Sequence, residues 1–461
     1  MGNWFSIRGR GGRSSDEVFS VRACEVLDHL GYSQSMVRHR RDAWRERDCI
    51  VNNNMHVKDI TEITAGSKCE GFTVRYESDT DRVYLYNYAR CRIQGDVSIS
   101  QKNHYEFTMN SESCHPGYFR LELKHIGNIE NSHIQQALFV DDKGRTFISS
   151  EKYMLSHLKG NNTKETVSGP AVTWRSEYAN GDNVYALPCT SQQMLLSEWI
   201  NRRRHHNWPT PDLIEEVSKL DAQMVPVGCK SSENKDIEWR ISFNTGEKRL
   251  TDSWNDSQYK IYIFFRWIMK SQLKSISDEI SSYILKNIIM WYIETNPAKR
   301  FKNKYLLENV ISCMKNLQDA IKTNQLRYYM IPGRNLLTGK INPEQQQLLI
   351  EKLHELITEG PQVILRCPKA YEALQMSPAE LSEKGRWRDE LDKIELERVN
   401  LWWQNWEPGI EWKEVTNRAW GNPYYKRLWE RIRDIVWPLW TEYEGNNQKD
   451  IVMKKLTDAL S

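Results

Sequence analysis

The chain has 461 residues, of which 39% are hydrophobic and 27% are charged, a composition typical of a globular protein with a substantial core. Its net charge of +3 at neutral pH is small, so a basic surface that binds nucleic acid would have to be local. No apolar run is long enough to span a bilayer, and no secretory signal is recognisable at the N-terminus.

The nine cysteines occur singly, without a CxxC pair and without the Cys/His spacing of a zinc site. An odd number of unpaired cysteines indicates reduced thiols in the cytosol. We therefore expect a cytoplasmic protein without zinc.

Residues 1–14 are predicted to form a flexible tail. The tail begins with MGNWFS, which matches the N-myristoylation pattern with Gly2 as the acylated residue, although so short a pattern also occurs by chance. One acyl chain gives only reversible membrane contact.

Residues 15–60 are predicted to form two helices, here called the spine segment, with Ser14 as the first N-cap and Gly31 as a stop. The second helix contains the run RHRRDAWRER, whose five arginines are Arg38, Arg40, Arg41, Arg45 and Arg47. Such a run is most often a solvated helix face, and the alternative is a ridge that binds the phosphates of a nucleic acid.

Residues 61–190 are predicted to be rich in strands, because apolar and polar residues alternate along them. Asp79 and Asp81 stand at the start of one such run, where residues i and i+2 share one face of a strand. Two aligned carboxylates repel each other unless a cation lies between them, and hard divalent ions such as Mg²⁺ take oxygen ligands. From the acidic pair alone, a solvated turn is the simpler interpretation.

The preceding Gly66-Ser67 favours a phosphate site, since glycine allows close approach of the backbone and serine donates a hydrogen bond. Two-metal nucleotidyl transfer normally uses a third carboxylate from a neighbouring strand. We favour Asp182, which begins the apolar run GDNVYALPC, although a turn residue after Gly181 is equally compatible with the residues alone. The other acids considered are Asp96, Asp141 and Asp142.

Residues 191–375 are predicted to be mainly helical, and residues 376–461 form a tryptophan-rich helical extension. Nine of the eighteen tryptophans lie between Trp387 and Trp440. At this density we expect a packed core or an interface rather than an array that stacks on bases.

Several stretches occur together in one order: AGSKCEG, ESDTD, HPGY, GDNVYALPC, HHNWPT, EWRISFNTGEKRL, SSYILKNIIMWYIE and YYMIPGRNLL. With them the sequence resembles the Mab (male-abnormal-twenty-one) family of nucleotidyltransferases, over roughly residues 15–370. That family includes cyclic GMP-AMP synthase and the cGAS-like receptors of invertebrates.

The resemblance implies an α+β, bilobed protein, with a nucleotidyltransferase core at residues 61–190 and a helical lobe at residues 191–375. It implies that Asp79, Asp81 and Asp182 bind Mg²⁺ or Mn²⁺ and that Gly66 and Ser67 bind the phosphates of ATP or GTP. Three further residues match positions that contact the nucleotide: Arg240 and Ser242 at the base and Lys286 at a phosphate. A salt bridge for Arg240 and a surface position for Lys286 are the alternatives. The aromatic residue that stacks on the acceptor base and the oligomeric state stay unassigned.

One departure from vertebrate cyclic GMP-AMP synthase concerns the zinc-binding insertion, since the matching stretch TDSWNDSQYKIYIFFRW contains neither His nor Cys. This makes double-stranded DNA a less favoured activator than double-stranded RNA, which a basic ridge can bind through shape and phosphates. A second departure is Arg82, which follows Asp81 and is expected on the opposite face of the strand.

The sequence therefore predicts an enzyme that joins and cyclises nucleoside triphosphates into a cyclic dinucleotide messenger of innate immunity when it senses nucleic acid. One alternative is a membrane-associated adaptor that binds nucleotides without reacting them, which the pattern at Gly2 favours. The other is a scaffold that uses the tryptophan-rich extension as an interface. The complete set of acids favours the enzyme.

Overall fold

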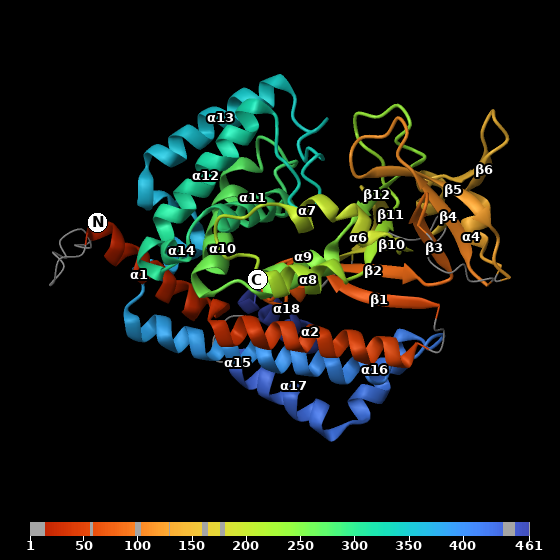
Figure 1. Ribbon diagram of the computed structural model, residues 1–461. Coiled ribbons are helices and arrows are strands. Elements are labelled where there is room, and N and C mark those ends of the chain that lie inside the picture. The colour runs from red at the N-terminus through yellow and green to blue at the C-terminus, as the bar shows by residue number, and fades with distance from the viewer. Residues whose placement is uncertain are drawn as a thin grey trace. The chain divides into compact units, whose positions relative to one another are not determined.

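The computed structural model describes residues 14–55, 59–96, 103–128, 130–158, 165–175, 180–436 and 448–460 (Figure 1). Gly2 lies outside the described residues. The chain forms two compact units, each assembled from separate segments. The helical unit comprises residues 1–34, 196–218 and 250–385, and the sheet unit comprises residues 35–195, 219–249 and 386–461. The fold is α+β, as the resemblance implied, and none of the helices in the described ranges has the length and apolarity needed to cross a membrane.

The sheet unit contains every strand found in the described residues. They are β1 (Ile60–Ala65), β2 (Thr80–Tyr86), β3 (Ala89–Ile93), β4 (Tyr105–Asn110), β5 (Tyr118–His125), β6 (Leu138–Val140), β7 (Thr146–Ile148), β8 (Thr166–Ser168), β9 (Ala171–Arg175), β10 (Asn180–Cys189), β11 (Ala222–Val225) and β12 (Glu238–Ser242). Short helices connect them: α3 (Gly66–Cys69), α4 (Ser132–Ala137), α5 (Ser150–Ser156) and α6 (Gln192–Leu195). The helix α9 (Asn244–Asp252) follows β12.

Strand β10 joins the two parts of the sheet. Its first half lies between β2 and β9, with β1 beyond β2 and β8 beyond β9. Its last residues pair with β11, which continues through β12, β5 and β4 to β3. The strands β6 and β7 extend from β5. Apolar residues of β1, β2, β10 and β11 pack together in one cluster, and β10 is buried from Ala186 to Cys189, whereas Asp182 near its beginning is half-buried.

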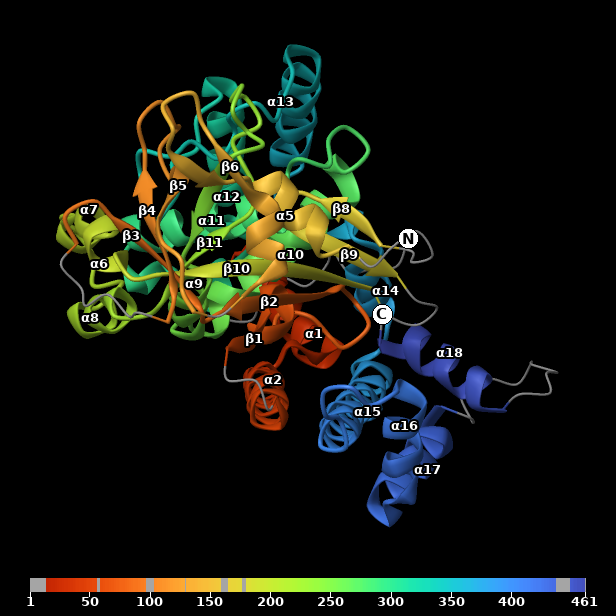
Figure 2. The ribbon, with the colours of Figure 1, turned by 90° about the vertical axis from the view of Figure 1, so that its right-hand side faces the viewer.

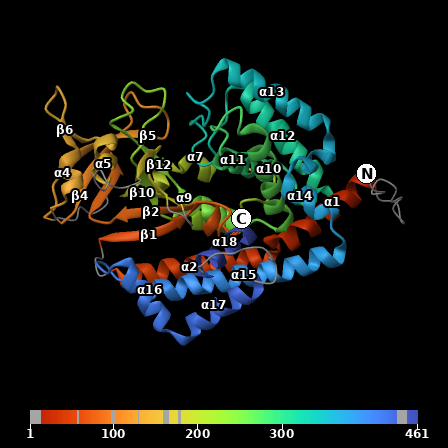
Figure 3. The same ribbon diagram turned by 180° about the vertical axis from the view of Figure 1, so that it is seen from behind.

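Four helices after residue 377 belong mainly to this unit: α15 (Pro378–Trp403), α16 (Trp412–Gly421), α17 (Pro423–Val436) and α18 (Gln448–Leu460). The long helix α15 runs beside α2 (Gln34–Asn54), the second helix of the spine segment, as Figures 1 and 3 both show. Figure 2, viewed close to the helix axes, shows α15 between α2 and α17. Apolar contacts fix the pair, with Leu396 on Ala43 and Trp44, and Trp403 on Val51.

The helical unit is built around α10 (Asp256–Leu273), α11 (Ser282–Thr295), α12 (Leu306–Thr323) and α13 (Pro343–Thr358). Its remaining elements are α1 (Ser15–Leu27), the π-helix η2 (Asp28–Tyr32), α7 (Ser197–Asn201), α8 (Pro211–Ser218), the 3₁₀ turns η3 (Ala298–Arg300), η4 (Asn303–Tyr305) and η5 (Gly360–Arg366), and α14 (Pro368–Gln375). Ser14 accepts a hydrogen bond from the amide of Glu17, so it caps α1 as the sequence predicted. Asn255 and Asn342 form reciprocal capping boxes that start α10 and α13.

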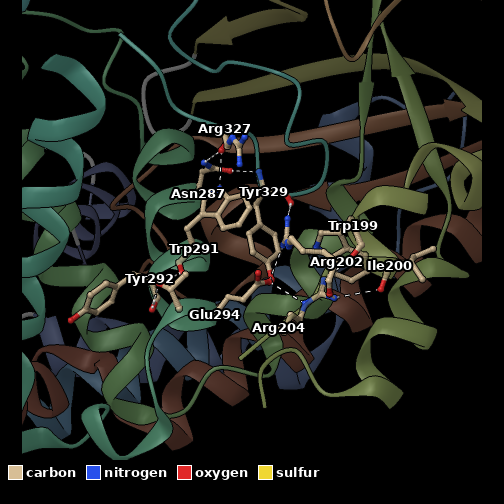
Figure 4. A network of polar contacts seen from close by, with 11 residues as sticks. Trp199, Ile200, Arg202, Arg204, Asn287, Trp291, Tyr292, Glu294, Arg327 and Tyr329 are labelled. Carbon is tan, nitrogen blue, oxygen red and sulfur yellow. Dashed lines mark hydrogen bonds and ion pairs between the residues drawn. The ribbon is translucent and has the colours of Figure 1, made fainter. Parts of the chain in front are cut away.

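A buried carboxylate connects two of the signature stretches of this unit, SSYILKNIIMWYIE and YYMIPGRNLL, with the arginines that follow α7 (Figure 4). Glu294 of α11 accepts hydrogen bonds from Arg202 at 2.8 Å, from Arg204 at 3.2 Å and from the hydroxyl of Tyr329 at 2.6 Å. The guanidinium of Arg202 also lies over the rings of Trp291, at 4.2 Å, and Tyr329, at 4.8 Å. The charge of Glu294 is therefore satisfied inside the unit, and these stretches have a packing role.

Candidate functional site

The parallel pairing of β2 with β10 brings Asp81 and Asp182 together. In the register of these strands Asp182 is opposite Asp81, and on the other side of Asp81 the antiparallel strand β1 places Ala65 opposite it. Gly66 and Ser67 follow Ala65 directly. One strand end therefore carries the Gly-Ser loop, Asp81 and Asp182 side by side.

Gly66 touches the carboxylate of Asp81. Its backbone has a φ of +69°, and a Cβ built on it would lie 2.0 Å from Oδ2 of Asp81. No side chain fits between the two, so the loop requires glycine both for its backbone conformation and for the space it leaves to the carboxylate.

Asp79 precedes β2 in an exposed turn, and its charge acts on Asp182. Partial burial raises the pKa of the Asp182 carboxyl, and the neighbouring charge of Asp79 raises it further, while Arg175 lowers it. Like charges gathered at one strand end favour a bound cation. The donors are carboxylate oxygens, which suit Mg²⁺ or Mn²⁺. Among the described residues, no group of three or more His, Cys, Asp or Glu side chains is arranged closely enough to hold a metal as it stands.

The other acids that the sequence left open have different surroundings. Asp96 accepts a hydrogen bond from Ser191 at 2.5 Å, and Asp141 pairs with Arg145 in the hairpin between β6 and β7. Asp142 is exposed in the same hairpin. None of the three is paired with Asp81 in the strand register, so Asp182 stays the third candidate ligand.

Lys68 is a residue of the site that the sequence reasoning missed. It is 4% exposed, and its Nζ donates a hydrogen bond to Oγ1 of Thr80, between Asp79 and Asp81, at 2.7 Å. Burial lowers the pKa of its ammonium well below the usual range, and Arg75 lowers it further, whereas Asp81 and Asp79 act in the opposite direction. A lysine directly after a Gly-Ser pair was the available signal.

Arg82 points away from the acids as expected. Its Nε lies 3.4 Å from the carboxylate of Glu62 on β1, and its guanidinium lies over the rings of Trp174 and Trp403. The cation next to Asp81 is therefore held on the other face of β2.

The five arginines of α2 do not form one exposed ridge, which corrects the expectation for Arg40 and Arg47. Both are 1% exposed. Arg40 pairs with Asp392 of α15, with its Nε 2.5 Å from the carboxylate, and Arg47 pairs with Glu62 of β1. A cation in the interior needs such a partner, so these two arginines hold α2 to its neighbours.

The remaining three arginines differ from one another. Arg38 and Arg45 are exposed, although Arg45 forms an ion pair with Asp42 one turn away. Arg41 is half-buried and donates a hydrogen bond to the carbonyl of Glu70 at 2.9 Å. Of these five arginines, Arg38 and Arg45 are the ones whose side chains lie fully on the surface of the helix.

A family model for the Mab-21 protein HhH/H2TH-like domain matches residues 260–355, which run from α10 to α13 in the helical unit. This match supports a Mab-21 family member. Mab-21 proteins have the nucleotidyltransferase fold, so transfer of a nucleotidyl group is the class of chemistry that the family indicates.

Lys286 lies inside the matched Mab-21 domain, on α11, and it is 7% exposed. The alternative of a surface lysine is therefore wrong.

Arg240 and Ser242 lie on β12 and are half-buried, two positions apart on one face of the strand. Trp239 and Ile241 between and beside them are fully buried on the opposite face. Both candidate base-contacting residues therefore lie on the more accessible side of the strand β12.

Proposed function

We propose that this Mab-21 protein is a metal-dependent nucleotidyltransferase that joins two nucleoside triphosphates, ATP and GTP, and cyclises them into a cyclic dinucleotide. The observation that supports it most is the register of Asp81 with Asp182, with Gly66 against the carboxylate of Asp81. A Gly-Ser loop beside paired acids is the arrangement that such a transfer needs.

In this proposal Asp79 and Asp81 hold Mg²⁺ or Mn²⁺ with Asp182, and the metal neutralises charge on the phosphates when it is bound. Ser67 donates a hydrogen bond to the triphosphate. Arg240 and Ser242 contact a base, and Lys286 contacts a phosphate. The ribose hydroxyl forms a bond to the α-phosphorus, the bond to the bridging oxygen breaks, and pyrophosphate leaves. The hydroxyl proton goes to the carboxylate of Asp182.

The test is a product assay on the purified protein with ATP, GTP, CTP and UTP and with Mg²⁺ or Mn²⁺. Parallel reactions contain no ligand, duplex DNA or duplex RNA, and products are identified by mass spectrometry. Asp79→Ala should abolish the product, and Asp142→Ala, an exposed aspartate in a hairpin, is the matched control that should keep it. A product that survives Asp79→Ala would refute the metal assignment.

Double-stranded nucleic acid, with RNA favoured, is the proposed activator, and Arg38 and Arg45 are its proposed contacts. Removing a cation that binds a phosphate should weaken the complex and reduce its salt dependence. Arg38→Glu with Arg45→Glu should therefore weaken the gel shift of duplex RNA, whereas Arg433→Glu on the surface of α17 should not. Equal gel shifts for both variants would remove α2 from the proposal.

The alternative is an adaptor that binds nucleotides without reacting them, which the acylation pattern at Gly2 favours. It predicts that no product forms in any of these assays, although nucleotides still raise the melting temperature of the protein. It also predicts that the acylated chain floats with lipid vesicles and that Gly2→Ala does not.

A further inference from the structure

The segment that carries Asp79 and Asp81 contacts α15 at residues that precede the two acids in the sequence. This segment, Arg75–Arg82, begins with turn residues before β2, and the amide of Glu77 donates to the carbonyl of Val74 at 3.1 Å. The hydroxyl of Tyr76 donates a hydrogen bond to Oε1 of Glu395 at 2.6 Å, and the amide of Arg75 faces Oδ1 of Asp392 at 3.4 Å. Asp392 and Glu395 are both 0% exposed, so these contacts are shielded from water.

The same segment contacts α15 a second time, directly after Asp81 in the sequence. The guanidinium of Arg82 lies 5.6 Å from the ring centroid of Trp403, the last residue of α15. Trp403 is buried, and Arg47 lies over its ring at 4.5 Å. One helix from the far end of the chain therefore holds both ends of the segment that presents the two aspartates.

The helix is itself held firmly. Asn400 donates hydrogen bonds to the carbonyl of Ala43, at 3.0 Å, and to the carboxylate of Glu46, at 3.1 Å. On its other side Arg398 pairs with Glu395 at 2.7 Å and donates a hydrogen bond to the hydroxyl of Tyr425 on α17, also at 2.7 Å. The carboxylate that receives Tyr76 is thereby fixed by α17 as well.

We propose that α15 positions the acidic pair, with Tyr76, Glu395 and Trp403 as the positioning residues. This inference rests on the proposed function, because it assigns to the C-terminal helices control over the same metal site. The hydrogen bond from Tyr76 sets where the turn before β2 ends, and the stacking of Trp403 keeps Arg82 on the face away from Asp81. A turn without this support samples other conformations, in which the aspartates no longer meet one cation.

The experiment compares Tyr76→Phe with Tyr424→Phe in the full chain. Each variant loses one tyrosine hydroxyl that donates to a glutamate of α15 at 2.6 Å, but Tyr424 lies on α17 and does not touch the segment with the acids. Three properties are measured: amide hydrogen exchange in peptides that cover residues 73–82, the Kd for Mn²⁺ from its electron paramagnetic resonance signal, and kcat and KM for the nucleotides.

For Tyr76→Phe we expect exchange in residues 73–82 to become about tenfold faster, the effect of removing one hydrogen bond to a charged group. The Kd for Mn²⁺ should rise and kcat should fall by about the same factor, with KM unchanged. Tyr424→Phe should match the wild type in all three. Trp403→Leu should repeat the effects of Tyr76→Phe, and Trp403→Phe, which keeps an aromatic ring over Arg82, should partly restore the wild-type values.

Exchange in residues 73–82 that is equal in both tyrosine variants would overturn the attachment to α15. Faster exchange without a change in Mn²⁺ affinity or kcat would leave these residues a merely structural role and overturn the positioning. A wild-type chain that neither binds Mn²⁺ nor forms product would overturn the proposed function, and the positioning role with it.

Discussion

The contact between Gly66 and Asp81 allows a sharp test of the site through Gly66→Ala. The substitution adds one methyl group to a residue whose φ is +69°, where an L side chain costs about 1–2 kcal/mol. The new Cβ would also lie 2.0 Å from Oδ2 of Asp81, about 1.4 Å inside ordinary van der Waals contact. Either the loop or the carboxylate has to move by about that distance.

A displacement of about 1 Å in a catalytic group reduces the rate by about 100-fold. We therefore expect Gly66→Ala to weaken Mn²⁺ binding and to lower kcat by about 100-fold, because Asp81 can no longer meet the metal together with Asp182. The free energy of unfolding should fall by only about 1–2 kcal/mol, since the clash is relieved by moving a side chain at a strand end.

Gly144→Ala separates the two effects. Gly144 has a φ of +73°, nearly that of Gly66, but a Cβ there would have no atom within 4 Å. It should lose similar stability in urea unfolding and keep its metal affinity and its rate. If both variants bind Mn²⁺ and turn over like the wild type, the carboxylate of Asp81 is not where the chemistry takes place.

The other predictions concern stability and can be checked by urea unfolding of the full chain. Burial, and then the charge of His133, lowers the pKa of His157 to about 3, so between pH 6.5 and pH 3 the imidazole is protonated in the unfolded state but not in the folded state. The free energy of unfolding should therefore fall by about 2 kcal/mol from pH 7.5 to pH 5, and it should fall less in His157→Phe. Burial raises the pKa of Asp389 to about 6, so ionisation of this carboxyl lowers the free energy of unfolding as the pH rises from 3.8 to 6. Asp389→Asn should stabilise the protein at pH 7.5 by about 1 kcal/mol, a value reduced for partial exposure. An unchanged urea midpoint would contradict this prediction. Asp392→Leu alone should cost about 3–5 kcal/mol because it removes the buried carboxylate that pairs with the buried guanidinium of Arg40, whereas adding Arg40→Met should recover most of that loss.

The local part of the site could be predicted from the sequence. The pair Asp79 and Asp81 before an alternating run indicates a strand that starts with acids, and the structure has β2 there. Gly66-Ser67 indicates a tight loop, because glycine adopts the positive φ of this loop without the strain that a Cβ causes. The strand-like run after Asp182 indicates that a strand carries this residue, and β10 places it beside Asp81.

The partners of the arginines in α2 could not be predicted. A run with five arginines is typical of a solvated surface, since helical periodicity alone does not say which cation meets an acid. Arg40 forms its ion pair with Asp392, which lies 352 residues away in the sequence, and Arg47 forms its ion pair with Glu62 on β1. The sequence also suggests contiguous domains, whereas the helical and sheet units each combine three separate segments.

The tryptophan-rich extension acquires a physical explanation from the same contacts. Trp403 packs on Val51 of α2 and carries two guanidinium groups, those of Arg47 and Arg82, over its ring. The ring of Trp403 gives these two guanidinium groups a cation–π contact in addition to their ion pairs with Glu62. The helix α15 therefore supplies the carboxylate of Glu395, which accepts the hydrogen bond from Tyr76, and the ring of Trp403, which contacts Arg82. These contacts hold the chain on both sides of Asp79 and Asp81. The Mab-21 model matches residues 260–355 of the helical unit, and these contacts connect α15 to the segment with the acids that the proposed function uses.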